Sequence, residues 1–211
     1  GDTKVVPRGK GDKIFINTSG IGLVEGDVHI SAMNARPGDA IILSGSMADH
    51  GITILTQRAG LSLQGNLTSD TMALHRLVRK MLDEAPGAVH TLRDPTRGGV
   101  ATSLNEIAEA ARVSVELEEG DIPVKPAVAA ACEILGMDPL YLANEGKLLA
   151  LVDKDYAGRV LDIMRSLPEG ADAAIIGRVA DGPAGRVVLK TVAGGSRIVS
   201  SLTGEPLPRI C

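Results

Sequence analysis

The stretch RDPTRGGVATSLNEIA, residues 93–108, places a glycine-containing loop directly before a predicted amphipathic helix. The apolar positions of that helix recur at the spacing of one helical face: Val100, Leu104, Ile107, Ala108 and Ala111. Short apolar runs typical of strands lie on both sides of it. The stretch therefore indicates a mixed α+β chain.

The rest of the sequence continues this alternation. Turn residues and apolar runs predict strands at residues 13–17, 28–32, 40–43, 114–118, 147–152, 173–179 and 186–191. Helical spacing predicts helices from Ser69 to the residue before Pro86, over residues 125–136 with Gly136 as the stop, and around residues 160–167. Sequence repeats and low-complexity segments are absent.

The predicted domain boundary lies near Pro37, where short extended pieces give way to regular alternation. Residues 1–37 are interpreted as a stub that precedes a compact α/β domain at residues 38–203. Residues 204–211 form a predicted tail that Pro206 and Pro208 keep extended.

Composition excludes several classes of protein. The chain has 44% hydrophobic residues and a net charge of −4, with one Phe, two Tyr and no Trp. Few aromatic rings and the lack of a basic cluster argue against nucleic-acid binding. No apolar run approaches the roughly 20 residues of a membrane helix, and no signal peptide opens the sequence. We therefore predict a cytoplasmic protein that contacts neither nucleic acid nor membrane.

The last residue, Cys211, is an unusual place for a thiol. Exposed cysteines oxidise and cross-link, and chain ends are normally accessible. The terminal thiol is therefore either incidental or a carrier group. Cys132, within an Ala-rich helix, is predicted to be a small core residue.

The loop before residues 100–111 is a candidate binding site. Asp94 and Arg97 flank the start of the helix, where free N–H groups and the helix dipole favour an anion. The structural alternative is that Asp94 or Thr96 caps the helix while Arg97 pairs with a carboxylate. Physical reasoning leaves the two interpretations even.

Two further segments carry polar residues beside apolar runs. In ADHG, Asp49 and His50 follow a predicted strand, where His50 can move a proton or orient a carboxylate, although a structural role is the commoner one. In ANEG, Asn144 and Glu145 enter a buried strand, which makes Glu145 the best acid–base candidate. The alternative is a turn in which Asn144 and Gly146 adopt positive φ and Glu145 faces water.

The segment GDTK at the start offers a carboxylate to a divalent cation through Asp2, and a hydroxyl to phosphate through Thr3. Lys4 adds a positive charge. Taken by itself, the segment is more typical of a solvated turn.

In their order along the chain, these motifs resemble the HypE family of hydrogenase maturation factors. The resemblance rests on GDTKV, ADHG, RDPTRGG before ATSLNEIA, ANEG and the terminal PRIC, and it extends over essentially all 211 residues. The family belongs to the PurM-like superfamily of aminoimidazole ribonucleotide synthetase. The implied fold is therefore α+β, with a complete PurM-like second domain at residues 38–203, preceded by the last strands of a truncated first domain. The resemblance thus implies that residues 1–37 are the remnant of an N-terminal ATP-binding and dimerisation domain.

The resemblance implies a reaction and partners. In the family, the carbamoyltransferase HypF loads a carbamoyl group onto the terminal cysteine, here Cys211. ATP then drives dehydration to an S-cyanide. The cyanide passes through a HypC–HypD complex to become a ligand of the [NiFe]-hydrogenase iron. Family members are usually homodimers through first-domain sheets, and they carry roughly another half-domain before the position matching Gly1. We therefore expect this chain to be inactive by itself.

The resemblance also assigns roles to residues. Cys211 carries the reacting group, Glu145 removes protons and Lys4 stabilises charge on the activated oxygen, although which of the last two is the base stays open. Asp2 is assigned as the Mg²⁺ ligand. The residues assigned to ATP are Asp2, Thr3, Asp49, His50, Asp94, Arg97 and Asn144.

Two alternatives of other kinds remain. One is a different ATP-dependent synthetase of the superfamily, which would have no use for a terminal thiol. The other is a non-catalytic docking or dimerisation module in which Cys211 is incidental.

Overall fold

The computed structural model describes residues 19–24, 26–60 and 67–202. Its helices are α1 (Asp49–Ala59), α2 (His75–Glu84), α3 (Gly99–Ala111), α4 (Pro126–Leu135) and α5 (Ala157–Arg165). Its strands are β1 (Ala40–Leu43), β2 (Val89–Arg93), β3 (Ser114–Glu118), β4 (Leu149–Val152), β5 (Ala174–Ala180), β6 (Arg186–Lys190) and β7 (Ser196–Ile198). Single 3₁₀ turns lie at Ala32–Asn34, Glu119–Asp121, Pro139–Tyr141, Lys154–Tyr156 and Pro168–Gly170. None of the helices in these residues is long and apolar enough to span a bilayer.

The strands form one sheet in the order β2-β4-β1-β5-β3-β6-β7. Each neighbouring pair is antiparallel except β3 and β6, which run parallel. In the β1–β4 pair, Leu43 lies opposite Leu149. Because these two strands run in opposite directions, the end of β1 and the start of β4 meet at the same end of the sheet. The mixed α+β prediction is confirmed.

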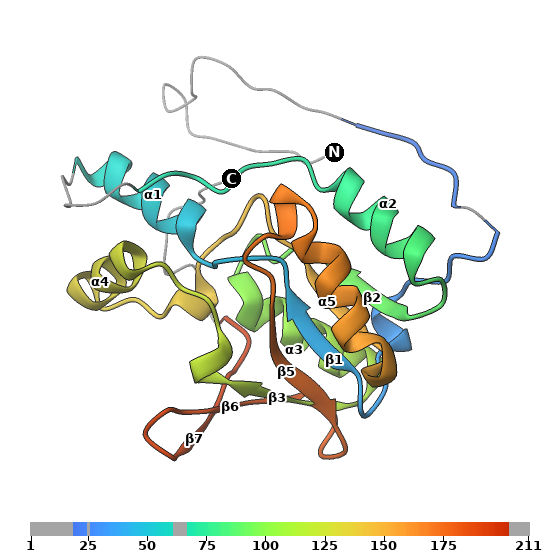
Figure 1. Cartoon of the computed structure of the whole chain (residues 1–211). Helices are drawn as coiled ribbons and strands as arrows, with labels where there is room; N and C mark the ends of the chain where they lie inside the picture. The colour runs from blue at the N-terminus through green and yellow to red at the C-terminus, as the bar shows by residue number, and fades with distance from the viewer. Residues whose placement is uncertain (1–18, 25, 61–66, 203–211) are drawn as a thin grey trace, which may run out of the picture.

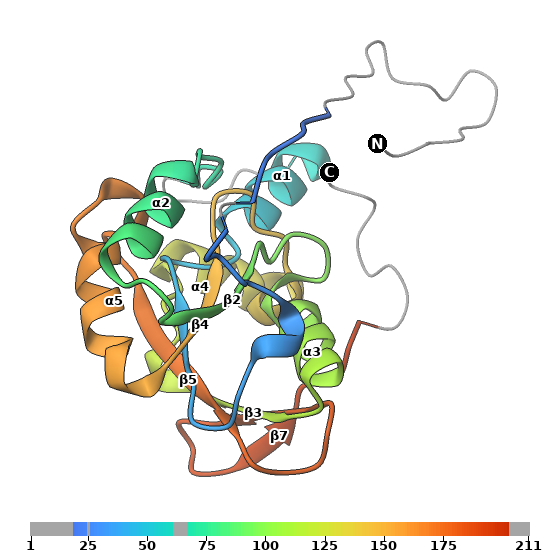
Figure 2. The same cartoon turned by 90° about the vertical axis from the view of Figure 1, so that its right-hand side faces the viewer.

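Helices cover the sheet on both faces. In Figure 1, α5 lies in front of the sheet with α2 beside it, whereas α3 lies behind; Figure 2 shows the same layers from the side. Ile41 and Leu43 of β1 belong to the core under α3, while Ala40 and Ile42 belong to the core under α2 and α5. Successive side chains of a strand point to opposite faces, so an all-apolar strand such as β1 needs cover on both.

At one end of the sheet, α1 and α4 form a third apolar cluster (Figure 1). Cys132 of α4 lies in it and is 2% exposed. Burial, and then the negative charge of Asp138, raise the pKa of the Cys132 thiol from 9.0 to about 11. The prediction that Cys132 is a core residue is confirmed.

Cys132 should therefore react slowly in the folded protein. Two pKa units lower the thiolate fraction by about 100-fold, and burial slows access further. We expect iodoacetamide at pH 8 to label Cys132 at least about 100-fold faster in urea than in buffer, as followed by peptide mass spectrometry. Equal rates in the two conditions would contradict the burial of this thiol.

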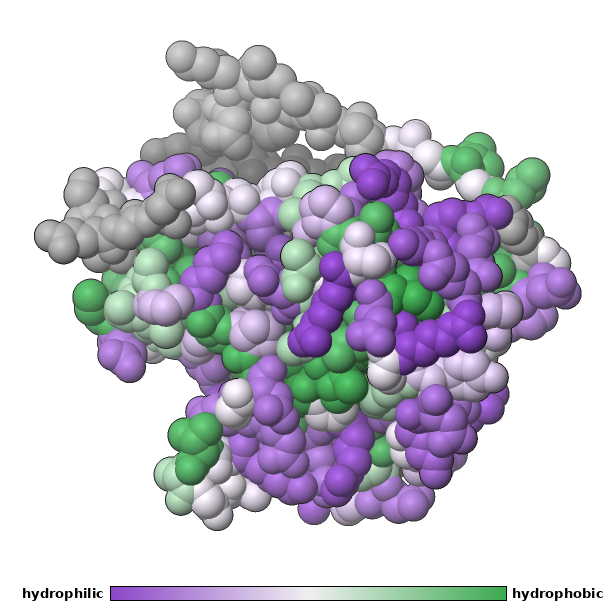
Figure 3. Space-filling view, in the orientation of Figure 1, coloured by the Kyte–Doolittle hydropathy of each residue, from purple (hydrophilic) through white to green (hydrophobic). Residues whose placement is uncertain are grey.

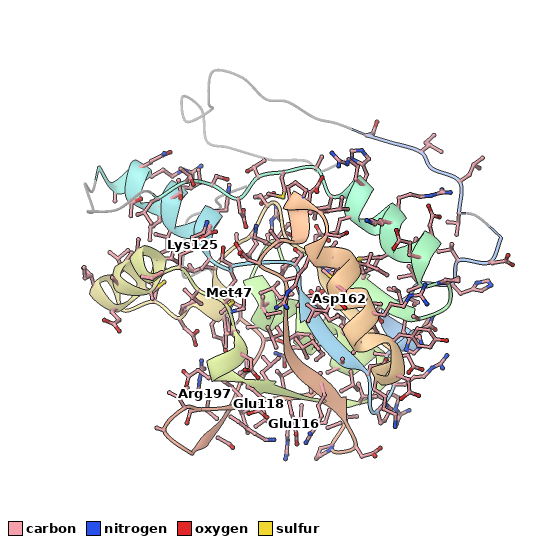
Figure 4. The ribbon with its side chains drawn as sticks, viewed as in Figure 1. Met47, Glu116, Glu118, Lys125, Asp162 and Arg197 are labelled. Atoms are coloured by element: carbon pink, nitrogen blue, oxygen red, sulfur yellow. The ribbon has the colours of Figure 1, made fainter. Side chains whose placement is uncertain are left out.

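The face of the sheet opposite α3 is open at β5, β3 and β6, and it carries charged pairs. Glu116, labelled in Figure 4, accepts hydrogen bonds from Arg178 Nη2 at 2.6 Å and Lys190 Nζ at 3.1 Å. The hydrogen bond from Lys190, followed by the charge of Arg178, lowers the pKa of Glu116. In Figure 3 the apolar surface of this side of the molecule is broken into separate patches by hydrophilic residues. Exposed pairs of this kind contribute little stability.

The strand predicted at residues 28–32 is wrong. The Ser31 N–H donates to His90 O at 3.1 Å and Ser31 O accepts from the Thr91 hydroxyl at 2.8 Å, so this segment lies beside β2 without a regular ladder. The Ser31 hydroxyl accepts from the Met33 N–H at 3.3 Å and starts the 3₁₀ turn Ala32–Asn34. Side-chain capping thus displaces strand pairing here. The strand predicted at residues 13–17 lies outside the described residues.

The predicted start of a helix at Ser69 is also wrong, because α2 begins at His75. The Ser69 hydroxyl instead accepts from the Thr71 N–H at 3.2 Å and lies 2.9 Å from His50 Nδ1. Helix α1 and strands β2 and β7 were not predicted.

Candidate active site

The candidate site lies at the end of the sheet where β1 finishes and β4 begins. Ser44 and Leu148 join the two segments: Ser44 N–H donates to Leu148 O, and Leu148 N–H donates to Ser44 Oγ, both at 3.0 Å. The segments that continue from this pair carry four of the predicted site residues: Asp49, His50, Asn144 and Glu145. Residues far apart in the sequence are thereby brought to one end of the sheet.

Asn144 is fully buried, and its side chain binds main-chain groups. Oδ1 accepts from the Ala48 N–H at 2.8 Å, while Nδ2 donates to Pro95 O and Leu142 O, both at 3.0 Å. The Asn144 N–H also donates to Pro95 O, at 3.2 Å. The side chain thus ties the turn before α1 to the loop before α3. Since both amide hydrogens are used, the predicted contact with a nucleotide would have to use the second lone pair of Oδ1.

Asp49, the first residue of α1, is 1% exposed. Its Oδ2 accepts from Ser46 Oγ at 2.6 Å and from Lys125 Nζ at 2.7 Å. Figure 4 labels Lys125, which precedes α4 and lies next to α1. The other oxygen, Oδ1, is buried without a hydrogen bond to the described residues. Oδ2 of Asp49 is therefore paired with the Lys125 ammonium group, whereas Oδ1 is an acceptor without a donor among the described residues.

His50 follows Asp49 in α1 and is largely buried. Its Nδ1 lies 2.9 Å from Ser69 Oγ, which lies 2.6 Å from Thr71 Oγ1. Its Nε2 is buried and has no hydrogen-bond partner in the described part of the chain. His50 and Asp49 are each bonded to a different segment, so His50 does not orient the Asp49 carboxylate.

Glu145 lies beside a buried charge pair. Its N–H donates to Asp70 Oδ1 at 3.0 Å, and its own Oε1 is buried with no hydrogen bond among the described residues. Asp70 Oδ2 lies 3.9 Å from Lys147 Nζ, and the two side chains are 1% and 8% exposed. Neither Asn144 nor Gly146 has a positive φ. The positive φ expected at these two residues is therefore wrong, and Glu145 itself is half-buried.

Two glycines allow the close packing of this site. A Cβ on Gly146 would lie 1.8 Å from Asp70 O and 2.7 Å from Met72 N. A Cβ on Gly99 would lie 2.4 Å from Leu140 O, and the φ of Gly99 is +62°. Any side chain at these two positions would separate the segments that build the cluster.

Asp94 and Arg97 are exposed at the loop before α3. The N-cap of α3 is Gly98, which has no side-chain capping bond, so the alternative of a cap by Asp94 or Thr96 is wrong. Pro95, which lies between Asp94 and Arg97, is buried, and its carbonyl accepts hydrogen bonds from Asn144. The loop is thus anchored to the buried cluster while its two charged side chains reach the surface.

Cys211, Lys4, Asp2 and Thr3 lie outside the described residues, so their assigned roles stay predictions. Among residues 19–24, 26–60 and 67–202, no group of three or more His, Cys, Asp or Glu side chains is placed to hold a metal ion.

Sequence reasoning missed the residues that complete the cluster: Ser69, Asp70, Lys125 and Lys147. Ser69 and Asp70 were attributed to a helix start, and Lys147 was counted as the first residue of a strand. A usable signal was present at Lys147, because a cation next to an all-apolar buried strand requires a partner.

With this geometry established, comparisons with known proteins identify the family. A model of the AIR synthase related protein, C-terminal domain, matches residues 36–190. The chain belongs to this family. The AIR synthase related match includes every described residue of the candidate site.

Individual relatives agree with this family match. Carbamoyl dehydratase HypE of Azotobacter vinelandii is 53% identical over 211 residues, which is 100% of this chain and 62% of that protein. A crystal structure of the hydrogenase maturation protein HypE in complex with ATP has a TM-score of 0.81 at 47% identity, covering 86% of this chain and 55% of that one. A HypE–HypF complex gives 0.81 at 41% identity, covering 85% and 58%. The resemblance to HypE proteins is confirmed.

Proposed function

We propose that this AIR synthase related chain carries the reacting thiol of an ATP-dependent carbamoyl dehydratase. The reaction converts a carbamoyl group on Cys211 to an S-cyanide, which supplies cyanide ligands for the iron of a [NiFe]-hydrogenase centre. The observation that carries the proposal is the similarity to carbamoyl dehydratase HypE over all 211 residues.

Overall, the S-carbamoyl group on Cys211 loses the elements of one water molecule. A carboxamide oxygen is a poor leaving group, and ATP supplies the phosphoryl group that makes it a good one. The C–O bond then breaks and phosphate departs with the oxygen. The nitrogen loses both of its protons, and the C–N bond becomes a triple bond. The sulfur of Cys211 stays bonded to carbon throughout.

Glu145 is the residue proposed to accept a proton from the carboxamide nitrogen. Its Oε1 is buried and has no hydrogen bond in the described part of the chain, so it is a vacant acceptor. Lys4 is proposed to stabilise negative charge on the activated oxygen. Two further buried groups at this end of the sheet, Asp49 Oδ1 and His50 Nε2, have no hydrogen bond to the described residues and are proposed as contacts for the polar atoms of the substrates.

ATP is the proposed co-substrate because a HypE relative has been solved in complex with it. Thr3 is proposed to contact phosphate, and the described residues proposed to face the nucleotide are Asp49, His50, Asp94, Arg97 and Asn144. Mg²⁺ is proposed at Asp2, outside the described residues. The described residues do not provide a metal site, so we derive no step through the ion.

The proposed partner for loading is a HypF carbamoyltransferase, since a HypE–HypF complex is among the similar structures. A HypC–HypD complex is the proposed acceptor of the cyanide. We further propose that the whole protein is a homodimer and that it works in the cytoplasm.

Mass spectrometry of the C-terminal peptide tests the function. In the full-length protein incubated with HypF and a carbamoyl donor, Cys211 should gain a carbamoyl group and then lose one water after addition of ATP. Cys211→Ala should block loading, whereas the matched Cys132→Ala variant should load and dehydrate normally. Loading at Cys132, or loss of water without ATP, would overturn the proposal.

A further inference from the structure

We propose that Asp70 is a positioning residue for Glu145, with Lys147 as its buried counter-charge. This inference rests on the proposed function. Asp70 Oδ1 accepts the Glu145 N–H at 3.0 Å, so the carboxylate fixes the main chain from which the proposed base projects. Asp70 belongs to the segment that crosses between α1 and α2 (Figure 1), whereas Glu145 lies in the loop before β4, which begins at Leu149.

The charge pair behind this contact is poorly suited to stabilising the fold. The side chain of Asp70 is 1% exposed, that of Lys147 is 8% exposed, and the Nζ–Oδ2 distance of 3.9 Å is too long for a hydrogen bond. Asp70 Oδ2 is left without a hydrogen-bond partner among the described residues. Buried ion pairs offset their desolvation cost only when their geometry is good. The Asp70–Lys147 pair therefore carries an uncompensated desolvation cost. Because the pair lies next to the proposed base, we infer that it has a role in the reaction.

The segment that contains Asp70 is in direct contact with the segment that contains Glu145. Because a Cβ on Gly146 would lie 1.8 Å from Asp70 O, the chain at Asp70 touches the chain next to Glu145. Ser69, the neighbour of Asp70, is bonded to His50 on α1. A displacement of the Asp70 segment would therefore move Glu145 as well.

This displacement matters because proton transfer depends on position. A general base must lie within hydrogen-bond reach of its proton, and an error of about 1 Å costs about 100-fold in rate. Asp70 has no part in the bond changes and acts through Glu145.

A double-mutant cycle tests the inference in the full-length protein. Asp70→Ala should slow the ATP-dependent loss of water from carbamoylated Cys211 by about 10- to 100-fold, while loading by HypF is unchanged. Asp70→Asn keeps an oxygen acceptor for the Glu145 N–H and should restore the rate to within about threefold of wild type. In the Glu145→Gln background, Asp70→Ala should have no further effect, since its contribution runs through Glu145.

The control is Asp39, a second buried carboxylate, which lies 2.9 Å from His90 Nδ1 and precedes β1 at the other end of that strand. Asp39→Ala should lower the melting temperature and affect both Glu145 backgrounds equally. If Asp70→Ala is too unstable to assay, Asp70→Ala combined with Lys147→Met removes the unpaired buried charge and should show the same dependence on Glu145.

Equal effects of Asp70→Ala in both backgrounds, or failure of Asp70→Asn to rescue, would overturn the positioning role while leaving the proposed function intact. Absence of ATP-dependent loss of water in the wild-type protein would instead overturn the proposed function.

Discussion

Asn144→Ala should lower the free energy of unfolding by about 3 kcal/mol or more, because it removes three buried side-chain hydrogen bonds and leaves two buried main-chain groups without a partner. Those two groups are the Ala48 N–H and the Leu142 carbonyl, whereas the Pro95 carbonyl keeps its bond from the main-chain N–H of residue 144. The side chain is 0% exposed, so water cannot replace it without opening the packing. Urea unfolding of the 211-residue chain, followed by circular dichroism, measures the change.

Asn105→Ala is the matched control. Asn105 is also a buried asparagine, but its Nδ2 donates to Ala101 O within its own helix, α3, at 2.8 Å and to Val199 O at 2.9 Å. Only the second of these bonds joins distant segments, so we expect a loss of about 1–2 kcal/mol. Equal losses for the two variants would show that Asn144 does not hold the loops before α1 and α3 together.

The elements that were predicted from the sequence are those with a clear local pattern. Helix α3 (Gly99–Ala111) has an apolar stripe of helical period, and α4 (Pro126–Leu135) begins with proline and stops before Gly136. Strand β3 (Ser114–Glu118) has the predicted bounds. In each case propensity, periodicity and end signals agree, so that tertiary contacts had nothing to override.

Helix α1 was missed because its local signals favour other structures. It contains Gly51 and a run of β-branched residues at 52–54, which are weak helix formers. Tertiary contacts compensate: the Gly51 N–H donates to Ala143 O at 3.0 Å, and Ile52 is fully buried in the cluster with α4. A Cβ on Gly51 would lie 3.0 Å from Leu142 Cβ, so a residue that disfavours the helix is the one that fits there.

A site residue could be predicted where one segment of sequence places a charged side chain next to a buried apolar strand. Glu145 stood out because a carboxylate next to a buried strand is costly, and the structure places one of its oxygens in the interior without a bond to the described residues. Asp70 did not stand out, because its contact with Glu145 joins residues 75 positions apart. Pairing of that kind depends on the arrangement of β1, α1 and β4, which no local pattern specifies.

Glu145→Gln in the full-length protein should slow the dehydration of carbamoylated Cys211 by about 10²–10⁴-fold, the usual contribution of a general base. Glutamine preserves the shape of the side chain and the main-chain bond to Asp70, and it removes only the basic oxygen. Loading should continue at the normal rate, because that transfer is assigned to HypF. The carbamoyl adduct should therefore accumulate, and mass spectrometry distinguishes it from the cyanide adduct, which is one water lighter.

Glu106→Gln is the matched control for this change. Glu106 lies on α3 and pairs with Arg93 at 2.8 Å, with both side chains about half exposed, so the same substitution should leave the dehydration rate unchanged. If Glu145→Gln instead forms cyanide at the wild-type rate, the vacant acceptor on Glu145 is not the base. His50 would then be the best remaining candidate among the described residues, since its Nε2 is buried without a partner at the same end of the sheet, and Lys4 would be the alternative. Accumulation of the carbamoyl adduct in Glu145→Gln but not in Glu106→Gln would assign the proton transfer to Glu145, the residue whose main chain is bonded to the buried Asp70.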